Sequence, residues 1–127
     1  MAEAIDLLIV DDEPDICWAL EVGLGGEGYR ITHVTRGEDA LREVERQAFA
    51  LAIVDAKLPG RSGLELSKLM RQRDPRLKIL LLSGYYYEDD RPIQEGIERS
   101  NFVGFISKPF ELDEVSALVK RLVGEDP

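Results

Sequence analysis

Five short apolar runs, separated by segments with helical periodicity, limit what this chain can fold into. The runs cover residues 5–10, 29–34, 49–54, 77–82 and 102–106. Short apolar runs of this kind are typical of parallel strands that are buried on both faces of a sheet. Strands that alternate with helices favour right-handed βαβ crossovers. The pattern therefore predicts an α/β fold, with a mostly parallel five-stranded sheet and helices on both faces.

The segments between the runs contain apolar residues at the spacing of amphipathic helices, over 16–24, 40–48 and 112–122. Two helix starts match the capping-box pattern, at 35–38 and at 62–65. A fourth helical region, 88–100, has no clean apolar stripe because Pro92 and Gly96 interrupt it.

Residues 23–28 match the dinucleotide-binding pattern G-x-G-x-x-G literally. That fingerprint must follow a strand and open a helix, whereas this segment closes a helix and precedes a strand. We therefore interpret it as helix termination, with a left-handed glycine satisfying the last carbonyls.

The length of 127 residues suits one ordinary domain, so we expect a single domain over 1–127. A net charge of −9 opposes sequence-independent attraction to nucleic acid or to an anionic membrane. No apolar run approaches the ~20 residues that cross a bilayer. The single cysteine, Cys17, cannot form an intramolecular disulfide, and residues 1–4 lack the pattern of a secretory signal, so we expect a cytoplasmic protein.

Polar side chains of related chemistry follow four of the apolar runs. Asp11 and Asp12 follow the first, Asp55 the third, Ser83 the fourth and Lys108 the fifth. Ligands of open parallel sheets bind outside the carboxyl ends of the strands. Carboxylates that converge there repel one another, by about 4 kcal/mol per pair at 4 Å and an effective dielectric of 20, and therefore need a cation. Mg²⁺ prefers such oxygen ligands, and lysine and serine suit phosphate oxygens, so the pattern predicts a Mg²⁺-dependent phosphate site with a nucleophilic carboxylate.

In order and spacing, four motifs resemble the receiver domain of bacterial two-component response regulators over nearly the whole chain. They are Asp11-Asp12, the segment 54–60 with Gly63, Ser83-Gly84, and Lys108-Pro109-Phe110. The resemblance implies a flavodoxin-like (βα)5 fold with strand order 2-1-3-4-5. It implies a phosphorelay switch with self-catalysed phosphorylation and dephosphorylation, and not an enzyme acting on a separate substrate. It also suggests a cis peptide bond between Lys108 and Pro109.

By this resemblance, Asp55 is the phosphoacceptor, supplied by a histidine kinase, a phosphotransfer protein or a small acyl phosphate. Asp12, Asp55 and the backbone carbonyl of Lys57 would bind Mg²⁺ directly. Asp11 would act mainly through a bound water.

The resemblance assigns the remaining roles to Ser83, Lys108 and Phe105. Ser83 and Lys108 would hold phosphoryl oxygens. Ser83 and Phe105 would relay the change to the surface of the fourth helix, fifth strand and fifth helix. That surface would face a downstream protein target, and in many receivers a second copy of the chain.

The run Tyr85 to Tyr87 departs from the pattern, because small residues commonly follow the Ser-Gly pair. Either these tyrosines pack a longer loop, or at least one of them contacts a partner or shields the phosphate. The sequence also leaves open a receiver-like interaction module that works without phosphate. A Mg²⁺-dependent phosphatase with an aspartyl-phosphate intermediate is disfavoured, because that class wants an acid where Lys57 stands.

The simplest alternative for the acidic residues is that Asp11 and Asp12 form turns and that Asp55 caps a helix. This alternative explains each residue separately. It does not explain why acids, a hydroxyl and a lysine fall at the same edge of the predicted sheet.

Overall fold

The computed structural model describes residues 4–124, so both ends of the predicted domain 1–127 lie outside the described residues. A parallel five-stranded sheet runs through the middle of the molecule in the order β2-β1-β3-β6-β7. Its strands are β1 (Ile5–Val10), β2 (Tyr29–Val34), β3 (Leu51–Asp55), β6 (Lys78–Ser83) and β7 (Gly104–Ser107). Counted along the chain, this is the predicted order 2-1-3-4-5.

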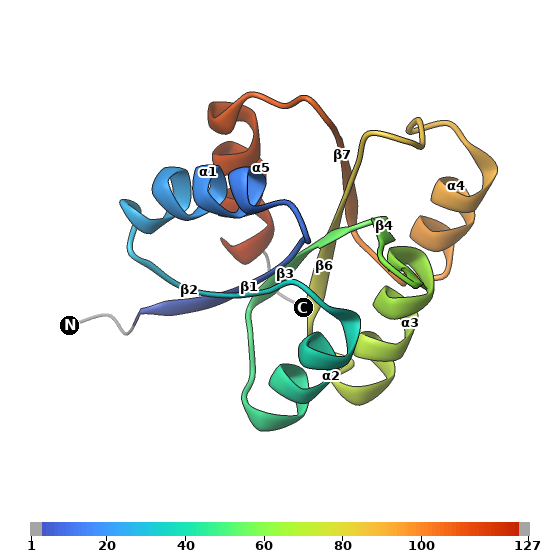
Figure 1. Ribbon diagram of the computed structural model, residues 1–127, viewed down its shortest axis with the longest axis horizontal. Coiled ribbons are helices and arrows are strands. Elements are labelled where there is room, and N and C mark those ends of the chain that lie inside the picture. The colour runs from blue at the N-terminus through green and yellow to red at the C-terminus, as the bar shows by residue number, and fades with distance from the viewer. Residues whose placement is uncertain (1–3, 125–127) are drawn as a thin grey trace.

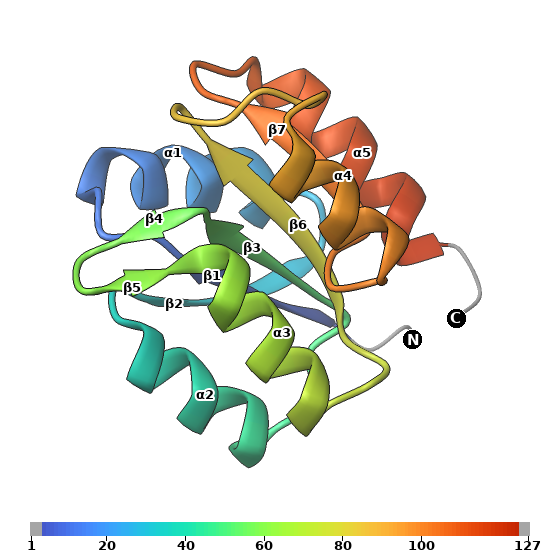
Figure 2. The ribbon, with the colours of Figure 1, turned by 90° about the vertical axis from the view of Figure 1, so that its right-hand side faces the viewer.

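Five helices cover the sheet: α1 (Pro14–Gly25), α2 (Gly37–Arg46), α3 (Gly63–Arg73), α4 (Arg91–Glu98) and α5 (Leu112–Gly124). Helices α1 and α5 pack on one face, and α2, α3 and α4 pack on the other (Figures 1 and 2). The predicted flavodoxin-like fold is confirmed. Within residues 4–124, no helix has the length and hydropathy that a membrane span requires.

The apolar runs have their origin in this two-sided burial. In β1, Leu8 and Val10 pack toward α2, α3 and α4, whereas Leu7 and Ile9 pack toward α1 and α5. All four side chains are fully buried. Burying each one contributes roughly 1.5–3 kcal/mol, so both faces of the strand must be apolar.

The helix ends agree with the sequence in part. Ser62 caps α3, where its hydroxyl accepts a hydrogen bond from the Leu64 N–H at 3.2 Å. The capping box predicted at 35–38 is wrong, because the chain stays extended through Arg36 and that residue, not Thr35, is the N-cap of α2. Segment 23–28 does close a helix, and Gly28 adopts the left-handed conformation at φ 87°.

Helix α4 is shorter than the predicted region 88–100, and both residues that interrupt its pattern have a structural place. Pro92 lies in the first turn, where a missing N–H leaves no hydrogen bond unmade. Gly96 faces the buried ring of Phe102, which occupies the space that a Cβ would need. A short hairpin of β4 (Lys57–Leu58) and β5 (Arg61–Ser62), which we did not predict, precedes α3.

Candidate functional site

Four strand ends bring polar side chains to one edge of the sheet. Asp11 follows β1, Asp55 ends β3, Ser83 ends β6 and Lys108 follows β7. Asp11, Asp55 and Ser83 are buried, at 1%, 5% and 1% exposure. A buried carboxylate needs compensation, so the neighbours of these two acids decide what the site can do.

Lys108 lies at the centre of the acidic groups. Its Nζ is 3.2 Å from Asp11 Oδ2, 3.1 Å from Asp55 Oδ2 and 2.8 Å from Glu13 Oε1. Burial lowers the pKa of Lys108, but the hydrogen bond from its ammonium to Glu13 and the charges of Asp11 and Asp55 outweigh it, and the net effect raises that pKa. The lysine therefore stays charged beside the carboxylates. Sequence reasoning missed Glu13, although it continues the acidic run after the first strand.

Asp11, Asp12 and Asp55 could together hold a metal ion. Each offers one carboxylate oxygen, and these oxygens lie within 4.8 Å of one another. Asp11 Oδ2 is buried and accepts no hydrogen bond from the described residues, although it lies at ion-pair distance from Lys108. Burial and, to a lesser extent, the charge of Asp55 raise the pKa of Asp11 to about 6. Lys108 therefore does not fully compensate the negative charge of the cluster, and the all-oxygen donor set of the cluster fits Mg²⁺.

The segment after β3 fixes the position of Asp55. The Lys57 N–H donates to Asp55 Oδ1 at 3.1 Å, and the Gly63 N–H donates to the Ala56 carbonyl at 2.7 Å. A Cβ on Gly63 would overlap the carbonyl oxygen of Asp55. Only glycine therefore allows α3 to begin directly against the backbone of Asp55.

Ser83 and Lys108 are joined through the backbone. The Lys108 N–H donates to the Ser83 carbonyl at 2.8 Å, and the Lys108–Pro109 peptide bond is cis, as predicted. The Ser83 hydroxyl accepts hydrogen bonds from the N–H groups of Tyr85 and Tyr86, both at 2.9 Å. A rotation of this hydroxyl would therefore change hydrogen bonds at the start of the loop between β6 and α4.

Phe105 is half-buried on β7 and packs against the core on the side of α2, α3 and α4. Its register partner on β6 is Leu81, two residues before Ser83. The structure thus places both predicted switch residues on neighbouring strands.

The remaining reactive side chains have structural surroundings. Burial and then the charge of Asp11 raise the pKa of Cys17 to about 11, which disfavours the reactive thiolate. The Cys17 thiol donates to the Asp11 carbonyl at 3.3 Å, so it supports the strand end. His33 Nδ1 lies 3.0 Å from Glu21 Oε1 at the surface.

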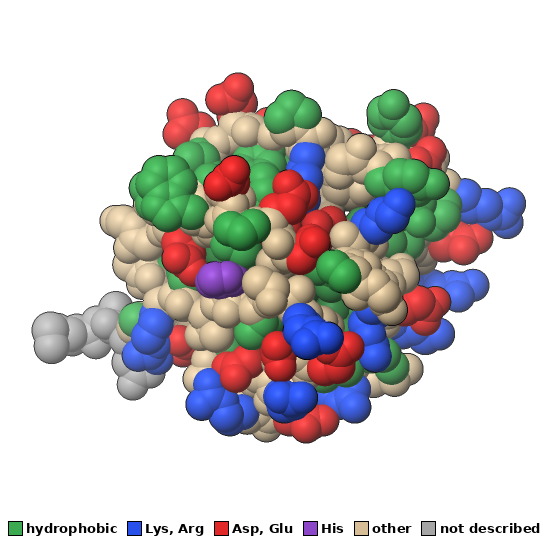
Figure 3. Space-filling view, in the orientation of Figure 1, with side chains coloured by type: hydrophobic (Ala, Val, Ile, Leu, Met, Phe, Trp, Pro, Cys, Tyr) green, Lys and Arg blue, Asp and Glu red, His purple; other side chains and the backbone are tan. Residues whose placement is uncertain are grey.

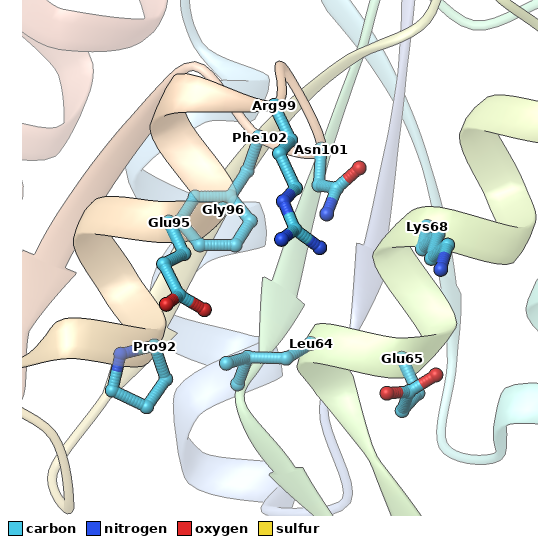
Figure 4. Close-up of a pocket in the computed structure, with 9 residues that line it drawn as sticks. All are labelled: Leu64, Glu65, Lys68, Pro92, Glu95, Gly96, Arg99, Asn101 and Phe102. Carbon is cyan, nitrogen blue, oxygen red and sulfur yellow. The ribbon is translucent and has the colours of Figure 1, made fainter.

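A cleft of about 200 Å³ lies between α3 and α4 (Figure 4). Phe102 forms part of its lining, and its rim alternates in charge through Glu65, Lys68, Glu95 and Arg99. Among the described residues, the one group of acidic side chains that could hold a metal is the cluster at the sheet edge, not this cleft.

A doubly wound parallel sheet with three acids and a lysine at its carboxyl edge defines an α/β protein with a candidate ligand site at that edge. The model of the response regulator receiver domain matches residues 7–120. The chain therefore belongs to the response regulator receiver domain family of two-component signalling, as the sequence motifs predicted.

Two curated relatives show the range of proteins that contain such a domain. Sporulation initiation phosphotransferase F of Bacillus subtilis is 33% identical over 115 residues, which are 91% of this chain and 90% of that protein. The DNA-binding transcriptional regulator NtrC of Escherichia coli K12 is 30% identical over 115 residues. This chain spans 91% of its own length in that match but only 24% of NtrC.

Solved structures support the same assignment. The response regulator TrrA of Thermotoga maritima, in complex with Mg²⁺ and BeF, has a TM-score of 0.80 and 34% identity, with 93% of this chain and 98% of that one covered. The receiver domain of a sensor histidine kinase of Pseudomonas aeruginosa PAO1, with magnesium in its active-site cleft, has a TM-score of 0.83 and 27% identity, with 96% and 99% covered. Receiver domains similar to this one thus bind Mg²⁺, and this chain has an acidic cluster that could do so.

Proposed function

We propose that Asp55 accepts a phosphoryl group in the presence of Mg²⁺ and that the phosphorylated chain is the second state of a signalling switch. The buried Asp55 carboxylate lies 3.1 Å from the Lys108 ammonium and within 4.8 Å of carboxylate oxygens of Asp11 and Asp12. Phosphoryl transfer needs positioning and charge neutralisation more than covalent chemistry from the protein, and these groups supply both.

In the proposed transfer from a histidine kinase or phosphotransfer protein, an Asp55 oxygen forms a bond to phosphorus as the phosphorus–nitrogen bond of phosphohistidine breaks. The imidazole leaves with the electron pair and takes up a proton. Lys108 binds one phosphoryl oxygen, and the Ser83 hydroxyl donates to another. Asp12, Asp55 and the Lys57 carbonyl would hold Mg²⁺ directly and Asp11 mainly through water; bound Mg²⁺ supplies positive charge that offsets the charge of the phosphoryl group.

If the Ser83 hydroxyl turns to the phosphoryl group, its two hydrogen bonds at the start of the β6–α4 loop change, and half-buried Phe105 can move inward without a polar atom to satisfy. We propose that the surface of α4, β7 and α5 then binds a downstream protein target or a second copy. Within 1–127, the chain would act as one domain that modifies only itself.

Beryllofluoride, a stable mimic of the phosphoryl group, tests the assignment of the site. We expect ¹⁹F NMR to show bound fluoride only when Mg²⁺ is present, and amide resonances to shift around Ser83, Phe105 and α4. Asp55→Asn should abolish both changes, whereas Asp89→Asn, at an exposed loop position, should leave them intact. Equal binding to Asp55→Asn would contradict the site assignment, and no binding to the wild type would favour a phosphate-independent interaction module.

A further inference from the structure

The cleft between α3 and α4 has an apolar end and an apolar floor. Leu64 of α3 and Pro92 of α4 lie at one end of the cleft (Figure 4). The buried ring of Phe102 lies against α4 at Gly96, where the helix has no side chain, and forms part of the lining. This part of the cleft can therefore contact a short apolar chain.

Arg99 and Asn101 form the other, polar end of the same cleft. Figure 4 shows the Arg99 guanidinium and the Asn101 carboxamide directed into the space between the two helices. No described residue forms an ion pair or a hydrogen bond with the Arg99 side chain. A guanidinium presents its N–H donors in a planar fork that matches a carboxylate, and a carboxamide adds a further N–H donor. The polar end is therefore complementary to a carboxylate.

The acidic side chains at the rim leave the Arg99 guanidinium available. Glu95 lies one helical turn before Arg99, but its carboxylate accepts a hydrogen bond from Arg91 at 2.9 Å. This hydrogen bond and, to a lesser extent, the charges of Arg91 and Arg99 lower the pKa of Glu95. On α3, Glu65 and Lys68 are both exposed, and their charges offset each other. The positive charge of Arg99 is therefore the one at this rim that is least compensated.

We propose that the α3–α4 cleft binds a small carboxylic acid with a short apolar chain, so that the domain takes a chemical input separate from Asp55. The carboxylate of the ligand accepts hydrogen bonds from Arg99 and Asn101, and its chain lies over the apolar end of the cleft. The cleft volume of about 200 Å³ suits a ligand of this size, because drug-sized ligands occupy pockets of about 300 Å³ or more. Binding requires neither Mg²⁺ nor a phosphoryl group on Asp55.

Isocaproate, a branched aliphatic acid, is a suitable probe. Titration of the unphosphorylated protein without Mg²⁺, followed by ¹H–¹⁵N NMR, should show saturable shifts that are largest around Leu64, Gly96 and Phe102. Isocaproamide has the same chain without the charge, and acetate has the charge without the chain. Each of these two compounds should bind at least about five-fold more weakly than isocaproate, because each lacks one of the two contacts.

Substitutions at the polar end test which side chains recognise the carboxylate. Arg99→Gln should weaken isocaproate binding about ten-fold, the effect of losing a charge-assisted hydrogen bond. Arg76→Gln is the matched control and should not change the affinity, because Arg76 is an exposed arginine of the loop after α3, outside the cleft. Glu95→Gln should tighten binding about two-fold, since it removes a negative charge beside the ligand. A gain in affinity also separates a local charge effect from a loss of folding.

Three results would each overturn the assignment of the cleft: no saturable shifts with isocaproate, equal binding of isocaproamide, or wild-type affinity in Arg99→Gln. A peptide that ends in leucine, acetyl-Ala-Ala-Leu, tests whether the same chemistry comes from the end of a partner's chain. If this peptide bound about ten-fold more tightly than isocaproate, the occupant would be a peptide end, and the assignment of a small acid would fail. None of these outcomes depends on whether Asp55 accepts a phosphoryl group.

Discussion

At the scale of single residues, Asp11 has the least favourable surroundings of the acidic cluster. It is 1% exposed, and one of its oxygens accepts no hydrogen bond within the described chain. The Lys108 ammonium is close to Asp11, but it also forms ion pairs with Asp55 and Glu13. A group that is shared in this way compensates each carboxylate only in part, which is why burial prevails and the pKa of Asp11 rises.

This raised pKa predicts a pH dependence for the metal-free protein. The folded state binds the Asp11 proton with a pKa of about 6, above the ordinary value of 3.8. The contribution of Asp11 to stability is therefore largest below the ordinary pKa and falls as the pH rises from about 4 to about 6, by roughly 1–3 kcal/mol. Urea unfolding in EDTA should show this loss in the wild type, and Asp11→Asn should remove it.

Asp89→Asn, at an exposed position of the β6–α4 loop, is the control and should keep the wild-type pH profile. Added Mg²⁺ should stabilise the wild type more at pH 7.5 than at pH 5, because it binds the ionised cluster. A wild-type profile in Asp11→Asn would mean that another group causes the pH dependence.

Most residues of the candidate site could be predicted from the sequence, because each follows a recognisable strand. Asp11, Asp55, Ser83 and Lys108 do lie at the ends of β1, β3, β6 and β7. The role of Glu13 could not be predicted, because its contact with Lys108 spans 95 positions of the chain and depends on where the start of α1 lies over the sheet edge. The roles of these residues stay predictions until the site is tested chemically.

At the scale of secondary structure elements, the contact between Gly96 and Phe102 fixes α4. A Cβ on Gly96 would overlap the ring of Phe102, which is fully buried and cannot easily move aside. Figure 4 shows this ring lying against the helix at Gly96, next to the α3–α4 cleft. The glycine that weakens the helical pattern in the sequence is therefore required by the packing of the helix.

We predict that Gly96→Ala lowers the free energy of unfolding by roughly 1–3 kcal/mol, the usual range for overpacking a filled core. Gly25→Ala is the matched control, because the added Cβ at the end of α1 meets no heavy atom within 4 Å beyond its chain neighbours and the adjacent helix backbone. That variant should be neutral or more stable by at most about 1 kcal/mol. Chemical denaturation measures both, and equal stability of the two variants would contradict the packing account.

The five long strands were predictable and the small elements were not. The runs identify β1 and β2 at their observed bounds, although only β1 has fully buried residues and β2, at the edge of the sheet, alternates half-buried with exposed ones. The two-residue strands β4 and β5 are too short to give a periodic signal. The cap of α2 was misassigned by one residue, because an extended Arg36 at the N-cap leaves Thr35 outside the first turn.

At the scale of the whole molecule, the strand order gathers one site from residues spread over most of the chain. Asp11 and Lys108 are adjacent in space because β1 and β7 belong to one parallel sheet whose carboxyl ends share an edge. Figure 3 shows basic side chains mixed with acidic ones on the face that it draws. The ion pairs of Lys108 with Asp11 and Asp55 differ from the surface pairs because both partners are largely buried.

The proposed role of the acidic cluster around Lys108 is to make Asp55 a phosphoacceptor. Intact mass spectrometry after incubation with acetyl phosphate, with and without Mg²⁺, tests it most directly. We expect an adduct of one phosphoryl group that requires Mg²⁺, is lost in Asp55→Asn and persists in the Asp89→Asn control. An unmodified wild type, or an adduct of equal yield on Asp55→Asn, would contradict it.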